Sequence, residues 1–315
     1  MNSVGIDISK GRSTVAVMRP FGEVVISPFE VRHTDSELSE LSELARQLKS
    51  LDGETRVVME ATGNYHTPVA KLLHDAGLYV SVVNAKLVHG YGNNDLRRVK
   101  TDRKDAVKLA NYGLDRWLTL PRYVPEENTR LLLKNCYRQY RQYSKVQTVL
   151  KNNLISLLDM TFPNANRLFV SPARADGSEK WVDFVAEFWH CECVSERSLK
   201  SFVNKYWRWC RKHGYNFSEE KAHAIYDEAS GHIGVMPKSE TTKLLVEQAV
   251  SQLSATSAAL AALKQEMQSL SSQLPEYPVV MGMFGVGPIL GPQLIAEIGD
   301  VRRFYSKKAL VAYAG

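Results

Sequence analysis

The chain has 315 residues, enough for two or three domains with sizeable cores. Hydrophobic residues make up 44% and charged residues 23%, which excludes disordered, collagen-like and low-complexity classes. Lys and Arg number 40 against 34 Asp and Glu, and the resulting formal charge of +6 suits a polyanionic partner.

The sequence predicts a cytoplasmic protein without a membrane partner. No apolar run approaches the length needed to cross a bilayer, and the first residues lack the basic-then-apolar pattern of a secretory signal. Four cysteines in so long a chain do not make a disulfide framework, so we expect reduced thiols.

Residues 1–123 alternate between strand and helix patterns. The predicted elements, in chain order, are strands over 4–9, 13–18 and 24–31, a helix over 36–48, a strand over 55–61, a helix over 67–76 and a strand over 78–84. The first three strands should be antiparallel, because short turns join them. This succession is expected of a ribonuclease-H-like α/β domain that ends near the Leu120-Pro121 break.

Residues 124–275 are predicted to be a helical coiled-coil region. Two stretches, 126–158 and 249–274, carry apolar residues at the alternating three- and four-residue spacing of a coiled-coil seam. They either pack on each other within one chain or form a dimer interface, and the spacing alone does not choose between these. Residues 162–237 between them read as a smaller helical insert.

Residues 276–315 are predicted to begin a third domain. Gly285-Val286-Gly287 resembles a helix-hairpin-helix turn, whose backbone amides can meet a phosphate, and equally fits a plain glycine-rich helix connection. The sequence stops directly after Ala314-Gly315, so we expect this domain to be truncated here and to continue in the natural gene product.

Four acidic residues are candidates for a metal site. Asp7 lies inside the first strand, where a carboxylate is desolvated unless a partner such as a metal ion binds it. Glu60 ends an apolar strand, at the edge where open α/β sheets place their sites. Asp102 and Asp105 share one face if a helix has begun there. Each acid alone also fits a turn, surface or capping role, but together they suit Mg²⁺ and two-metal phosphodiester chemistry.

Cations surround the last two of these acids, and we expect them to contact nucleic-acid phosphates rather than bases. They are Arg97, Arg98, Lys100, Arg103, Lys104 and Lys108. The alternative is a solvated helix face. A second set along the next helix mixes cations with tyrosines that could stack bases, although some of these tyrosines lie on the seam and fit the core more simply. On the helix from Arg130 onwards, this set is Lys134, Tyr137, Arg138, Tyr140, Arg141, Tyr143, Lys145 and Lys151.

A weaker pattern offers ligands for a structural zinc ion. The residues are Cys191, Cys193, Cys210 and His213. Their spacing is not a standard zinc pattern, and nearby tryptophans favour ordinary aromatic packing, so zinc binding stays open. His66 and His89, near the acidic candidates, fit hydrogen-bonded structural roles better than metal ligation.

Several strings carry a resemblance to a known family. In chain order they are GIDISK, VVMEATGNYH, VVNAKLVHGYGNNDLRRVKTDRKDA and FGVGPILGPQLIAEIGDVRRFYSKKALVAYAG. They resemble the DEDD transposases of the insertion sequence 110 type. The resemblance covers both ends of the chain, and MEATGNYH and KTDRKDA are long strings in the right order. It implies a RuvC-like domain with Asp7, Glu60, Asp102 and Asp105 as catalytic metal ligands, a coiled coil, and a carboxy-terminal transposase domain.

The same resemblance implies a DNA transposase or recombinase that cleaves and exchanges strands with Mg²⁺, guided by a structured bridge RNA. That family's nucleophilic serine lies beyond the AYAG string, where this sequence ends; Ser306 precedes the string, and we assign it no catalysis. Because recombination holds two DNA partners together, we expect a homodimer or tetramer.

Three other functions are alternatives. A junction-resolving nuclease would use the same fold and acids with water as the nucleophile. A non-catalytic nucleic-acid-binding module would keep binding without Asp7 or Glu60. A sugar-kinase-like or chaperone-like ATPase also opens with an aspartate in a strand, but it needs a second glycine-rich phosphate loop, and residues 113–277 contain none.

Overall fold

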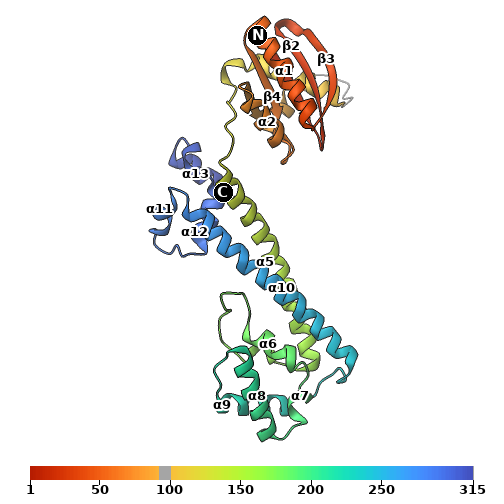
Figure 1. The fold of residues 1–315 in the computed structure, drawn as a ribbon, viewed down its shortest axis with the longest axis vertical. Coiled ribbons are helices and arrows are strands. Elements are labelled where there is room, and N and C mark those ends of the chain that lie inside the picture. Colours follow the sequence, from red (N-terminus) through yellow and green to blue (C-terminus); the bar gives the residue numbers. More distant parts are fainter. Residues whose placement is uncertain (92–100, 315) are drawn as a thin grey trace. The chain divides into compact units, whose positions relative to one another are not determined.

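The computed structural model describes residues 1–91 and 101–314, and the chain divides into two compact units, Met1–Glu126 and Glu127–Gly315 (Figure 1). Each unit has its own hydrophobic core. In the part of the chain that the structure describes, no helix has the length and apolar character needed to span a membrane.

The first unit is built on a five-stranded mixed sheet with the strand order β3-β2-β1-β4-β5. Strands β1 (Asn2–Ile8), β2 (Arg12–Arg19) and β3 (Glu23–Arg32) are antiparallel, whereas β4 (Thr55–Glu60) and β5 (Tyr79–Val83) run parallel to β1. The strands predicted from the sequence are confirmed. Their order and directions are those of the ribonuclease-H-like fold.

Helices cover both faces of this sheet. Helices α1 (Asp35–Asp52) and α2 (His66–Asp75) bury apolar side chains against Val4, Ile6 and Met59 on one face. Helix α4 (Asp102–Asp115) lies across the other face, with α3 (Ala85–Gly90) beside it. The side chain of Thr101 caps α4 by accepting a hydrogen bond from the Lys104 amide, so the helix begins at Asp102. A short 3-10 turn, η2 (Trp117–Thr119), follows α4.

Two glycines let α4 lie unusually close to the sheet. A Cβ atom on Gly5 of β1 would stand 2.2 Å from the Ala106 carbonyl oxygen and 2.4 Å from the Ala110 amide nitrogen. A Cβ atom on Gly113 of α4 would stand 2.4 Å from the Ser3 hydroxyl oxygen. Because these clashes involve main chain and short side chains, only glycine permits this approach.

Two long helices, α5 (Asn128–Thr161) and α10 (Glu240–Ser272), pack on each other in the second unit. One hydrophobic cluster joins the start of α5 to the end of α10, and another joins the end of α5 to the start of α10. The two helices are therefore antiparallel. The one polar residue of the first predicted seam, Gln147, donates a hydrogen bond of 2.8 Å to the hydroxyl of Ser257 on α10. Packing within one chain therefore accounts for the two seams.

The remaining helices of this unit form two groups. The insert, with η3 (Ala165–Arg167), α6 (Lys180–Glu187), α7 (Glu192–Ser195), α8 (Leu199–His213) and α9 (Glu219–Gly231), encloses an aromatic core. The last group contains α11 (Tyr277–Met281), α12 (Leu290–Ile298), η4 (Val301–Arg303) and α13 (Lys307–Ala314). This last group is joined to α5 by a bidentate ion pair between the buried guanidinium of Arg130 and the carboxylate of Glu276. The predicted glycine turn is the link between α11 and α12.

Candidate active site

The strand register places Asp7 and Glu60 on the same face of the sheet. Ile6 of β1 pairs with Met59 of the parallel neighbour β4, and both point into the core under α1 and α2. Because successive side chains alternate between faces, the next residue of each strand, Asp7 and Glu60, points to the α4 side. Both acids thus lie at the carboxyl ends of adjacent strands, on the face that α4 covers.

Helix α4 supplies the other two acids from its first turn. Asp102 is its first residue and Asp105 lies one turn further on. The four predicted acids, from β1, β4 and α4, all line one cavity of about 610 Å³. The sequence alone predicted that these acids could converge, and the close packing of α4 on Gly5 is the tertiary feature that brings them to a common cavity.

Other polar residues of this cavity were not selected as candidates. They include Ser9, Thr62, Lys86 and His89, and the sequence favours a structural role for the last of these. Ser9 and Thr62 could have been found by position, since each follows a strand that carries a candidate acid, whereas Lys86 and His89 lie within α3 and had no such signal. Lys108 also lines the cavity, and its ammonium group lies 3.5 Å from the main-chain oxygen of His89. His66 does not line it; burial lowers the pKa of its imidazole.

The carboxylate oxygens around the cavity are the donor type that a hard divalent cation prefers. Within the described residues, however, no three His, Cys, Asp or Glu side chains stand close enough together to form a ready ligand set. The donor chemistry fits Mg²⁺ or Mn²⁺, and binding would require the side chains to turn towards a common centre. Like charges repel at short range, so a bound cation favours that convergence.

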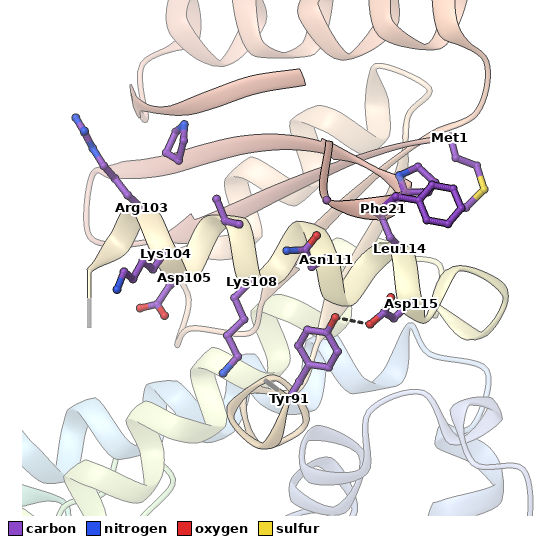
Figure 2. Close-up of a pocket in the computed structure, with 14 residues that line it drawn as sticks. Met1, Phe21, Tyr91, Arg103, Lys104, Asp105, Lys108, Asn111, Leu114 and Asp115 are labelled. Atoms are coloured by element: carbon purple, nitrogen blue, oxygen red, sulfur yellow. Dashed lines mark hydrogen bonds between the residues drawn. The ribbon is translucent and has the colours of Figure 1, made fainter. Parts of the chain in front are cut away.

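A second cavity, of about 1060 Å³, adjoins the first along the exposed face of α4 (Figure 2). We call it the α4 groove; α4, the end of α3 and the β2–β3 loop η1 (Pro20–Gly22) line it. Its cations are Arg103, Lys104 and Lys108, so three of the six predicted phosphate contacts share one groove. Asp105 and Lys108 line both cavities. The predicted contacts Arg97, Arg98 and Lys100 lie outside the described residues.

The structure assigns several cations and tyrosines of α5 to internal packing. Arg130 is 6% exposed and ion-paired, and Lys151 lies 2.6 Å from a carboxylate oxygen of Glu179. Tyr137 and Tyr140 pack against the cluster that joins α5 to α10.

The residues considered for zinc are part of the insert core. Burial raises the pKa of the Cys191, Cys193 and Cys210 thiols, which disfavours the thiolate that zinc requires. The His213 ring lies against Trp209, with the ring centres 5.2 Å apart. Ser306 accepts a hydrogen bond from the Ala309 amide and thereby caps α13.

Comparison with protein families identifies the chain. A model of the DEDD transposases of the IS110 type matches residues 4–163, just over half of the chain and all of the α/β unit beyond its first three residues. The chain belongs to this family. A second model, described as the transposase IS116/IS110/IS902 family, matches residues 277–315.

Relatives include an uncharacterised 44.8 kDa protein of insertion element IS116 from Streptomyces clavuligerus, which is 24% identical over 99% of this chain and 75% of its own length. The pilin gene-inverting proteins of Moraxella bovis and Moraxella lacunata are each 27% identical over 42% of this chain, which corresponds to 38% of their own length. Two Thermus thermophilus RuvC structures, one with a Holliday junction substrate, align with 39% of this chain at TM-scores of 0.28 and 0.26 and 12% and 16% identity.

Proposed function

We propose that the chain is the DNA-processing part of a transposase that cleaves and exchanges DNA strands of an insertion sequence with the help of Mg²⁺. The observation that supports this most directly is the common cavity of Asp7, Glu60, Asp102 and Asp105. Membership of the IS110-type transposases and the names of the relatives, which belong to an insertion element and to gene inversion, agree with it.

The four carboxylates would hold the divalent cation, which when bound supplies positive charge to the phosphodiester and acidity to a bound water or hydroxyl. The chain's own residues contribute position and charge. Close packing of Gly5 on α4 fixes Asp7 beside the first turn of α4. Arg103, Lys104 and Lys108 provide the positive surface on which the DNA backbone would lie next to the acids.

We further propose, from the family resemblance alone, that a structured bridge RNA guides the choice of DNA, and that two or four copies of the chain act together. RNA that copurifies with the protein and is encoded beside its gene would support the first part. The mass of the complex in solution, measured with and without DNA, tests the second.

Metal binding gives a test that does not depend on knowing the DNA target. Titration calorimetry should show that Asp7→Asn and Glu60→Gln each bind Mn²⁺ about tenfold or more weakly than the unaltered chain. Each substitution removes one charged oxygen ligand with little change of shape. Glu40→Gln on α1, an exposed acid outside the cavity, is the matched control and should bind Mn²⁺ like the unaltered chain. Equal affinity in all four proteins would contradict the site.

DNA cleavage separates the proposal from its alternatives. The protein with its own element DNA should cleave in Mg²⁺, and Asp7→Asn should abolish cleavage but not DNA binding. A product formed by water without any protein-DNA adduct would instead identify a nuclease. Binding without metal-dependent cleavage would identify a non-catalytic module.

A further inference from the structure

The β2–β3 loop carries a phenylalanine in a position that does not help folding. Phe21 has φ of 65°, and its side chain is fully exposed, at 107% of the reference area. A non-glycine residue in this left-handed region is strained, and an exposed ring contributes no burial. The next residue, Gly22, adopts positive φ without such strain. The exposed position of the Phe21 ring therefore indicates a role other than stabilising the fold.

Phe21 stands at one end of the α4 groove. Figure 2 shows its ring near Leu114 and Met1, whereas Arg103 and Lys104 lie at the opposite end of α4. Ten residues separate Lys104 from Leu114, which corresponds to about 15 Å along a helix. The groove thus has a cationic end and an aromatic end, a short distance apart.

Polar groups lie between these ends. Lys108 and Asn111 line the groove from α4, and Tyr91 lines it from the end of α3. The Tyr91 hydroxyl donates a hydrogen bond to Asp115, and burial together with that carboxylate raises the pKa of Tyr91 to about 12. Arg103 and Lys104 form no ion pair with any residue in the ranges described, so their charges remain available to a ligand.

Cations that follow a backbone and an exposed ring on which a base can stack are the features that bind single-stranded nucleic acid. In a duplex the faces of the bases are covered by stacking on the neighbouring base pairs, so none is open to a ring outside the helix. Asn111 adds an amide that can both donate to and accept from a base edge. The groove therefore fits a few unpaired nucleotides better than a duplex.

We propose that the α4 groove binds a single-stranded stretch of the DNA substrate and that Phe21 stacks on one of its bases. This rests on the proposed function, because the strand is assigned to DNA from the two residues, Asp105 and Lys108, that line both the groove and the acidic cavity. A strand whose phosphodiester reaches the acids continues directly into the groove. Phe21 then keeps that stretch unpaired and in register with the acids.

The test compares a blunt DNA duplex with the same duplex carrying a short oligothymidylate tail, each labelled with fluorescein and measured by anisotropy. The unaltered chain should bind the tailed duplex more tightly. Phe21→Ala should weaken tailed-duplex binding about 5- to 150-fold and leave blunt-duplex binding unchanged, since one base-aromatic stack is worth roughly 1–3 kcal/mol. Phe21→Trp keeps a stacking surface and should retain the tight binding.

Two controls separate stacking from folding. Leu118→Ala removes another exposed apolar side chain, 93% exposed and outside the groove, and should bind both duplexes normally. Phe21→Gly removes the backbone cost and should melt at the same temperature as the unaltered chain or higher, while it loses the preference for the tail. A Phe21→Ala protein that still prefers the tail overturns the inference, as does equal weakening for both duplexes.

A third probe, a duplex with an oligouridylate RNA tail, tests the assignment to DNA. Tighter binding of the RNA tail, lost in Phe21→Ala, would overturn that assignment. The proposed function is tested separately by Glu60→Gln, which should abolish cleavage and weaken Mn²⁺ binding while the preference for the DNA tail persists. Loss of the tail preference in Phe21→Ala alongside unaltered metal binding is the result expected.

Discussion

Gly5→Ala is the substitution that most directly tests how the fold builds the acidic cavity. The new Cβ would stand 2.2 Å from the Ala106 oxygen, 2.4 Å from the Ala110 nitrogen and 2.9 Å from the Ala110 Cα. All three atoms belong to the main chain of α4, so no side chain can turn aside. The helix itself must move.

The size of that movement follows from the contacts. Ordinary van der Waals contact begins at 3.4 Å, so α4 must shift by about 1 Å to accommodate the methyl group. Overpacking of this kind costs about 1–3 kcal/mol of unfolding free energy. Because Asp102 and Asp105 move with the helix while Asp7 and Glu60 stay on the sheet, a shift of this size would lower cleavage about 100-fold.

The assay follows both consequences in the full chain. Hydrogen exchange of the amides in residues 102–115 reports the stability of α4 against the sheet, and Mn²⁺ calorimetry reports the relative position of the acids. Gly90→Ala is the matched control, since a Cβ there meets nothing within 4 Å. A Gly5→Ala protein that matched Gly90→Ala in amide hydrogen exchange, Mn²⁺ affinity and DNA cleavage would refute the argument that a close glycine contact positions the acids.

Three further predictions concern the groove and the helical unit. Lys104→Ala should flatten the dependence of log DNA affinity on log salt concentration by about one unit, and an unchanged slope would exclude a phosphate contact. The hydrogen bond from Arg130 lowers the pKa of Glu276, so this ion pair should stabilise the fold above about pH 4.5 and lose its effect as the pH falls further. Urea unfolding should therefore show that Arg130→Met lowers the free energy of unfolding by about 2 kcal/mol at pH 7 and by less at pH 3. Leu260→Lys places a charge at a site 4% exposed against α5 and should lower the melting temperature at constant mass, whereas a smaller particle of unchanged stability would indicate a seam between copies.

The strand and helix pattern of the α/β unit could be predicted from the sequence because its signals are local. Alternation of apolar residues in β1 and β2 and helical spacing in α1 depend only on neighbouring residues. The four acids could be selected as candidates from local positions too, since each stands in a strand or in the first turn of a predicted helix, and only their combination favoured a metal site over a capping or surface role. The predicted seams also correspond to buried faces of α5 and α10.

The partner of those seams was decided only by tertiary structure. Apolar spacing specifies a buried face, but it carries no information on whether the covering helix comes from the same chain. The hydrogen bond from Gln147 to Ser257, across more than a hundred residues, provides that information. The ion pair between Arg130 and Glu276 could not be predicted for a related reason, because the two residues lie far apart in the sequence.

The sequence by itself determined which residues bear the charges and which elements carry them, since side-chain chemistry and hydrophobic periodicity are properties of short segments. Only the tertiary structure decided that β1, β4 and α4 present their acids to one cavity, because that depends on strand register and on the absence of a Cβ atom at Gly5. It also decided that Phe21 stands fully exposed at the opposite end of the α4 groove from Arg103 and Lys104. Neither property can be predicted from one segment alone, because each depends on how segments far apart in the sequence pack together.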